Sequence, residues 1–321
     1  MAEIPTARGT VDSGALGRVL MHEHVFVITP EVLQNFPEHW DEQLRVTDAV
    51  EKLTALKNAG IDTIVDPTVI GLGRYIPRIV EIAGKIDLNI IVATGVYTYD
   101  TVPKFFKFRG PVFPGLDVPD PMADMFIKDI TEGIADTGVR AAFLKCAIDE
   151  PGMTEDVARI LRAVAKAHLA TGAPIMVHTV PSMHRGLEVH ELLSGEGVDP
   201  SRVLLAHSGD VNDPDHLSEL ADLGYLLGMD RFGIDLYLPF EERVAIVATL
   251  AERGYTERMV LAHDASCYMD WIEPSYLEFS PNWHFLHITN DVLPALRERG
   301  VSDDQIDTML IANPQQWFAP A

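Results

Sequence analysis

The chain alternates between short apolar runs and longer stretches with helical periodicity. The short runs are rich in Val, Ile and Leu, which is typical of strands buried on both faces of a parallel sheet. The pattern predicts eight strands, at residues 17–24, 61–66, 88–94, 139–145, 173–178, 202–207, 225–229 and 259–263.

Helical patterns fill the spaces between these runs, and several of them end at a glycine that leads into the next strand. Helices are predicted at residues 46–59, 75–85, 121–133, 154–171, 184–193, 214–223 and 240–253. Strand–helix units in series, without a break in composition, favour an α/β fold of the (β/α)8 TIM-barrel type over one domain, residues 1–321. A doubly wound open sheet is the alternative, because alternation alone does not show closure.

Two segments are too long to be simple connections. Residues 96–120 follow the third predicted strand and are rich in Phe, Pro and Gly, and residues 264–281 follow the eighth. In a barrel both segments leave the carboxyl ends of strands, which form the catalytic face. Long loops at such positions are usually functional, so we expect both segments near the substrate.

Composition narrows the possible partners. The 321 residues carry a formal net charge of −23, which disfavours nucleic acid and anionic membranes. The two cysteines, Cys146 and Cys267, provide no disulfide framework. The sequence shows neither a signal-peptide pattern nor an apolar run of membrane-helix length, so we expect a soluble, cytoplasmic enzyme.

Candidate metal ligands lie where the predicted strands end. The first strand ends in His22-Glu23-His24, and side chains alternate along a strand, so the two histidines share a face and Glu23 points away. Further residues of this type follow at other strand ends, namely His178, His207 and Asp264. Imidazole and carboxylate suit zinc and related ions. Five ligands exceed the need of one catalytic zinc, which indicates a dinuclear metal centre at the carboxyl-terminal face.

Lys145 ends the fourth predicted strand and does not fit this set as an ordinary lysine. An ammonium group cannot ligate a cation and would be repelled by two of them. From the residues alone, an ion pair with a nearby carboxylate is the alternative role.

The order of these residues resembles the phosphotriesterase family of the amidohydrolase superfamily. The similarity runs through RVLMHEH at 18–24, GMDRFG at 228–233 and NPQQWF at 313–318. Within the family, GVY at 95–97 and DRFGID at 230–235 are most similar to the phosphotriesterase-like lactonases.

The resemblance implies a complete site. Lys145 would be carboxylated on its amine, and the carbamate would bridge the two ions together with a hydroxide. The other ligands divide between the ions, with His22, His24 and Asp264 on the more buried ion and His178 and His207 on the exposed one. The expected cofactor is two divalent ions per subunit, zinc first, with cobalt, iron or manganese as alternatives.

The same resemblance implies an activity. The metal-bridging hydroxide would attack a lactone carbonyl, and Asp264 would move the proton towards the leaving alkoxide. The expected substrate is a small-molecule lactone, in particular an N-acyl-homoserine lactone, so that the protein would act in quorum quenching. Promiscuous organophosphate triesterase activity and a homodimer are also implied.

Substrate contacts are predicted from the family pattern for Tyr97 and Arg231, and Cys267, in the loop after Asp264, is expected to line the acyl pocket. Each has a structural alternative: Tyr97 can cap the core, Arg231 can pair with Asp230 or Asp235, and Cys267 can act as a small apolar side chain. Four loop aromatics could form an acyl channel, pack their own loops or form a subunit contact, namely Phe105, Phe106, Phe108 and Trp271. Other histidines are interpreted as surface or packing residues: His39, His168, His184, His190, His216, His284 and His287.

Rival functions remain open at this point. A true phosphotriesterase, or an amidohydrolase that cuts other esters or amides, would share the metal ligands. A metal-binding pseudoenzyme would lack the bridge or the proton acceptor, yet Lys145 and Asp264 are both present.

Overall fold

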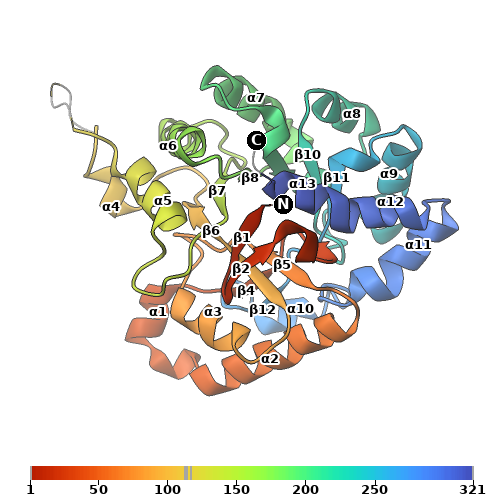
Figure 1. Cartoon of the computed structure of the whole chain (residues 1–321), viewed down its shortest axis with the longest axis horizontal. Helices are drawn as coiled ribbons and strands as arrows, with labels where there is room; N and C mark the ends of the chain where they lie inside the picture. Colours follow the sequence, from red (N-terminus) through yellow and green to blue (C-terminus); the bar gives the residue numbers. More distant parts are fainter. Residues whose placement is uncertain (1, 112–114, 116–117, 320–321) are drawn as a thin grey trace.

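The computed structural model describes residues 2–111, 115 and 118–319, and its centre is a barrel of parallel strands (Figure 1). The strands are β3 (Val19–Leu20), β5 (Thr63–Asp66), β6 (Asn89–Gly95), β7 (Phe143–Ala147), β8 (Ile175–His178), β9 (Val203–Ala206), β10 (Leu226–Met229) and β11 (Met259–Leu261). Each strand pairs in parallel with the next one along the chain. This order confirms the TIM barrel and rules out the doubly wound sheet, whose strand order reverses.

The barrel closes between its first and last strands without a regular ladder. The backbone N–H of Met21 donates to the carbonyl of Leu261 across this seam at 3.3 Å. The chain bends at residues 21–23 and resumes as β4 (His24–Val27), which pairs in parallel with β12 (Ser266–Met269). The predicted strand 17–24 is therefore two short strands, and His22 lies in the bend between them.

Alternating side chains of β7 face the inside of the barrel and the surrounding helices. Phe143 packs inside the barrel and Lys145 lines a cavity at its end, whereas Leu144 and Cys146 pack outward against helices. The strand continues to Ala147, so Lys145 lies within β7 and not at its end as predicted. The period of two still gives Lys145 and Cys146 the opposite directions that the sequence predicts.

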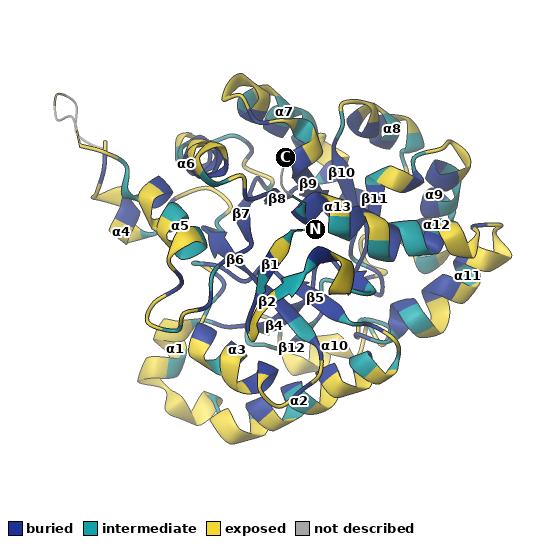
Figure 2. Cartoon of the chain, viewed as in Figure 1, coloured by how far each residue is buried: buried dark blue, intermediate teal, exposed yellow. Residues whose placement is uncertain are grey.

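Helices form the outer layer, with exposed outer faces and buried inner faces (Figure 2). Each predicted helix is present, as α2 (Glu42–Asn58), α3 (Ile76–Ala83), α5 (Pro121–Thr131), α6 (Glu155–Thr171), α7 (Arg185–Gly195), α8 (Pro214–Asp222) and α9 (Phe240–Glu252). Gly172 has a left-handed φ of 74° and ends α6 as predicted. None of the helices in the described part of the chain combines the length and apolar character needed to cross a membrane.

Several elements lie outside the predicted pattern. A hairpin of β1 (Glu3–Thr6) and β2 (Gly9–Asp12) begins the chain, and Ile4 packs in the same cluster as Phe318. Further helices are α1 (Pro30–Asn35), α4 (Lys104–Lys107), α10 (Pro274–Leu277), α11 (Leu293–Glu298), α12 (Asp303–Asp307) and α13 (Asn313–Phe318). In Figure 1, β1 and α13 accordingly lie together near the centre of the view.

Candidate metal centre

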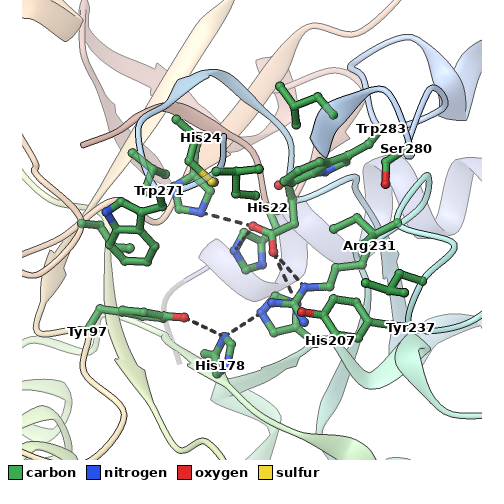
Figure 3. A pocket seen from close by; sticks show the side chains of 18 of the residues that line it. His22, His24, Tyr97, His178, His207, Arg231, Tyr237, Trp271, Ser280 and Trp283 are labelled. Atoms are coloured by element: carbon green, nitrogen blue, oxygen red, sulfur yellow. Dashed lines mark hydrogen bonds and ion pairs between the residues drawn. The ribbon is translucent and has the colours of Figure 1, made fainter. Parts of the chain in front are cut away.

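Four histidines and one aspartate converge at the carboxyl ends of the barrel strands (Figure 3). Oδ1 of Asp264 lies 3.3 Å from Nε2 of both His22 and His24. Nδ1 of His178 lies 2.9 Å from Nε2 of His207. The structure therefore brings together the five residues that the strand ends predicted, with one nitrogen of each ring facing a shared space.

The backbone turns sharply at two of these residues. His207 follows β9 with a φ of 69°, and Asp264 lies shortly after β11 with a φ of 54°. Left-handed backbone is uncommon for residues other than glycine and, where it is held by its surroundings, is often found at functional sites. At both positions it belongs to a residue whose side chain lines the shared space.

Asp230 holds two of the histidines from behind. Its Oδ2 lies 2.8 Å from Nδ1 of His22, and its Oδ1 lies 3.1 Å from Nδ1 of His207. The carboxylate is fully buried, and Gly228 leaves room for it, since a Cβ there would lie 2.6 Å from Oδ2. A carboxylate on the outer nitrogen fixes the tautomer and leaves the inner nitrogen free for a metal.

The other two histidines have equivalent partners. Nδ1 of His24 lies 2.7 Å from the Thr68 hydroxyl, and Nε2 of His178 lies 2.6 Å from Oδ2 of Asp149. Thr68 and Asp149 follow β5 and β7 in loops, and neither was predicted from the sequence. Asp230 was also missed as a partner, although it lies two positions beyond Gly228 and alternation could have placed it on the inner face.

Lys145 is the third kind of group in the site. Its side chain is 1% exposed, its Nζ has no hydrogen-bond partner, and it forms no ion pair within the described residues. Burial lowers the pKa of its amine to about 8. The ion pair considered from the sequence is therefore not formed. A buried amine without a partner, among residues of metal-ligand type, fits a lysine whose amine is modified with an anionic group, such as the expected carboxylate.

The protonation of the rings suits metal ligation. Burial lowers the pKa of His178 to about 4 and also lowers the pKa values of His22 and His207. His24 differs: burial alone would lower its pKa, but its interactions with Asp264 and Asp66 raise it to about 9. Since a metal binds neutral imidazole, an ion at His24 has to displace a proton.

Arg231 orients Asp264 and links it, through further ion pairs, to the buried core. Its Nε donates to Oδ2 of Asp264 at 2.9 Å, and its Nη1 donates to Oδ2 of Asp210 at 3.0 Å. The buried Arg243 donates to the other oxygen of Asp210 at 2.7 Å. Burial would raise the pKa of Asp264, but its contacts with His22, His24 and Arg231 hold that pKa well below the usual range. Asp264 is therefore ionised at neutral pH.

The site opens into a cavity of about 450 Å³. The metal-type residues form one end of the cavity. The remaining walls are largely apolar and include Leu72, Ile234, Leu236, Met269, Trp271 and Leu277. Tyr97 stands at the boundary, with its hydroxyl 3.4 Å from Nδ1 of His178, and burial raises the pKa of this phenol well above its usual value.

Matches to known proteins extend over nearly the whole chain. The model of a family described as the phosphotriesterase family matches residues 2–318. This chain belongs to the phosphotriesterase family. It is thus a hydrolase of a metal-dependent family, and the cluster of His22, His24 and Asp264 has side-chain atoms close enough to share one ion.

The names of individual relatives refer to different substrates. The chain is 54% identical to a phosphotriesterase homology protein of Mycobacterium tuberculosis, over 99% of this chain and 98% of that protein. A solved structure of the phosphotriesterase from M. tuberculosis covers 99% of both chains with a TM-score of 0.97. An aryldialkylphosphatase of Saccharolobus solfataricus is 36% identical over 97% of this chain and 98% of its own length. An N-acetyltaurine hydrolase of Dictyostelium discoideum is 25% identical over 98% of this chain and 97% of its own length.

The three substrate contacts predicted from the sequence divide into two groups. Tyr97 and Arg231 line the cavity, whereas Cys267 does not. Cys267 lies in β12, which pairs with β4, and packs in the outer core, where its carbonyl accepts a hydrogen bond from Lys52. Arg231 pairs with Asp210 and Asp264 instead of Asp230 or Asp235.

The loop aromatics also divide. Trp271 lines the cavity, as the channel interpretation requires. Phe106 is buried beneath its own loop, while Phe105 and Phe108 are exposed, and none of the three lines the cavity. The alternative role, packing of the loop, applies to Phe106.

Glu23 points away from the histidines on either side of it, as alternation predicts. Its carboxylate lies 2.6 Å from Nδ1 of His263 and accepts the backbone N–H groups of His263 and Ala265 at 2.8 and 3.0 Å. His263 is fully buried and its Nε2 accepts the N–H of Ile288, so it joins the core and not the metal site. Glu23 therefore joins the first and last strands of the barrel next to His22 and His24.

Proposed function

We propose that the protein hydrolyses the ring ester of acyl-substituted lactones, N-acyl-homoserine lactones in particular. One observation carries the proposal: a cavity of about 450 Å³ has metal-type ligands at one end and apolar walls at the other. An acyl lactone has the same division between a polar reacting group and an apolar tail. Burial of chain methylenes contributes about 0.8 kcal/mol each, which favours long acyl chains.

The metal-type residues fit a dinuclear centre. His22, His24 and Asp264 would hold one ion and His178 and His207 the other, with Lys145 between them as a carbamate. Two divalent ions, when bound, supply Lewis acidity and a water of lowered pKa. Zinc is the first expectation for this donor set.

Asp264 is the proton carrier in this proposal. Its carboxylate is ionised, because His22, His24 and Arg231 keep its pKa low. It can accept the proton of the attacking water and return it to the alkoxide that leaves when the ring opens. Arg231 holds Oδ2 of Asp264 at 2.9 Å and so fixes the direction from which the proton is taken.

Tyr97 and Arg231 contact the substrate at the boundary between the two ends. The phenol of Tyr97 stays protonated, because burial raises its pKa, and it can donate a hydrogen bond to a lactone oxygen. Arg231 lines the same cavity and presents a fixed positive charge. Both residues orient the ring while the acyl chain extends towards Trp271 and Leu277.

A phosphotriesterase is the second candidate function. The observation in its favour is the 36% identity to the aryldialkylphosphatase of S. solfataricus. The same ligands can serve attack at phosphorus, so we propose organophosphate hydrolysis as the weaker, promiscuous activity.

The deciding experiment compares kcat/KM for N-decanoyl-homoserine lactone, N-butanoyl-homoserine lactone and paraoxon on the metal-loaded protein. We expect the long-chain lactone to be turned over best and paraoxon least. A preference for paraoxon by orders of magnitude would overturn the lactonase proposal. Metal analysis of the same sample tests the pseudoenzyme alternative, which predicts at most one ion per chain and no gain of activity on adding cobalt.

A further inference from the structure

A second cavity, of about 570 Å³, lies on the other side of the segment that walls the metal-site cavity. It is bounded by α2 on one side and by β12 and residues 272–286 on the other, and in Figure 1 α2 runs along the lower edge of the molecule with β12 and α10 just inside it. Its volume is within the range of small-molecule sites, about 300–1,000 Å³.

The two cavities have one wall in common. Met269, Ile272, Leu277 and Trp283 line both of them. None of the metal-type residues of the first cavity lines the second. A ligand of the second cavity would therefore be held without the chemistry of the metal site.

The interior of the second cavity is mainly apolar. Cys267 and Phe285 are buried in the core, and Pro274, Leu277 and Leu286 complete an apolar surface beside them. Such a surface suits a linear hydrocarbon chain, because its burial requires no hydrogen-bonding partner.

Two cations of α2 line this cavity, and they differ in their partners. Lys52 is neutralised by Asp48 at 2.8 Å and also donates to the Cys267 carbonyl at 2.8 Å. Arg45 lies over the ring of Tyr268, with its guanidinium carbon 3.8 Å from the ring centroid. Arg45 forms no ion pair within the described part of the chain, and its Nε has no hydrogen-bond partner.

An unneutralised guanidinium is notable in a chain of net charge −23. The cation–π contact with Tyr268 restrains the guanidinium and so lowers the conformational entropy that would be lost on binding an anion. A carboxylate matches the guanidinium in geometry and charge.

We propose that the second cavity binds a linear acyl carboxylate, with the carboxylate on Arg45 and the chain against Cys267, Phe285 and Leu286. The site does not depend on the proposed lactone hydrolysis. Should that function hold, the ring-opened product, which has both an acyl chain and a carboxylate, belongs to the same ligand class.

The test measures the binding of decanoate and decanol to the metal-loaded protein by titration calorimetry. Decanol reports the apolar contacts alone, and the ratio of the two affinities reports the carboxylate contact. Three variants are compared with the wild type: Arg45→Gln removes the guanidinium, Ala55→Trp fills the rim of the cavity from α2, and Arg162→Gln removes one distant surface charge.

We expect Arg45→Gln to weaken decanoate binding at least about tenfold and to leave decanol within about twofold, since a hydrogen bond to a charged group is lost. Ala55→Trp should weaken both ligands, and Arg162→Gln neither. An unchanged decanoate-to-decanol ratio in Arg45→Gln would place the carboxylate elsewhere, for example at the metals, and would overturn the proposal. Equal losses in Arg45→Gln and Arg162→Gln would overturn it too, because they would show only the effect of overall charge.

Discussion

At the strand end of the metal-site cavity, every inward-facing imidazole has a fixed partner on its outer nitrogen, whereas at the loop end the lining side chains are mostly apolar and partly exposed. His22 and His207 share the buried Asp230, which leaves their rings little freedom. Leu236 and Tyr276, in contrast, are 87% and 65% exposed. The same cavity thus combines a rigid half and an adaptable half.

The difference between the two halves of the cavity separates the geometry of the metal site from the choice of acyl chain. Ligand geometry depends on strands and on hydrogen bonds between buried groups, so it tolerates little change. The apolar half depends on segments after β10 and β12, where substitutions change shape without breaking a buried network. We therefore expect mutations in the first half to affect metal content and kcat, and mutations in the second to affect the choice of acyl chain.

The largest expected effect is that of Lys145→Ala. Without the lysine, the two ions lose their common anionic ligand, and metal analysis should find at most one ion per chain. Activity should fall by at least roughly 10²–10³-fold, the range seen when one electrostatic element of a preorganised site is removed. Cys146→Ala, which alters the neighbouring side chain on the opposite face, should retain both ions. Full activity in Lys145→Ala would remove the bridging role.

Asp230→Asn should have the next largest effect. The amide cannot accept hydrogen bonds from both His22 and His207 as the carboxylate does, so metal affinity or kcat should fall by about 10–100-fold. Asp129→Asn is the matched control, because Asp129 pairs with Arg74 and Thr94 outside the metal site. Similar losses in both variants would mean that Asp230 acts only through general stability.

Trp271→Ala tests the adaptable half. Trp271 is 44% exposed, so only part of its apolar surface is available for an acyl chain. We expect kcat/KM for the decanoyl lactone to fall about fivefold. This is less than the loss of about 1.5–3 kcal/mol expected when the contact of a fully buried large apolar side chain is removed. The butanoyl lactone should change little. Phe108→Ala alters a loop aromatic outside the cavity and should affect neither substrate; equal losses for both lactones in Trp271→Ala would contradict a chain-specific contact.

The smallest expected effect is on stability at acid pH, and it concerns a histidine of the scaffold and not of the metal site. Burial lowers the pKa of His168, which lies in α6 with its Nδ1 2.8 Å from the Ala173 carbonyl. As pH falls below the unfolded value of about 6.5, the unfolded chain binds a proton that the folded chain does not, so stability decreases. Urea unfolding at pH 7 and pH 5 should show a smaller acid loss in His168→Gln than in the wild type. An equal loss would show that other groups dominate.

The sequence predicts the inner faces of strands well. A period of two is fixed by strand geometry, so Lys145 and Cys146 point in opposite directions even though β7 ends later than expected. His22 and His24 reach the same site even across a bend, because the chain resumes as a strand immediately after it. Asp230 was open to the same reasoning through Gly228.

The loops were harder to predict. Thr68 and Asp149 meet their histidines only because tertiary packing sets the paths of two loops, and no local pattern encodes those paths. Cys267 was expected in the acyl pocket because it follows Asp264 closely, but it lies in β12, which pairs with β4, and its side chain packs in the outer core. Proximity along the chain is weak evidence of proximity in space when a strand pairing intervenes.

The seam between the first and last barrel strands has a consequence for how the molecule forms. Glu23 joins His263 across 240 positions of sequence, and contacts of such separation carry a high entropic cost before they form. Two of the proposed ligands, His22 and His24, precede the seam and the third, Asp264, follows it, and their side chains surround the same point. An ion held by all three, as proposed, would bind only after the two ends of the barrel had met, and would therefore stabilise the closed barrel over any open intermediate. Metal loading would then be coupled to the last step of folding.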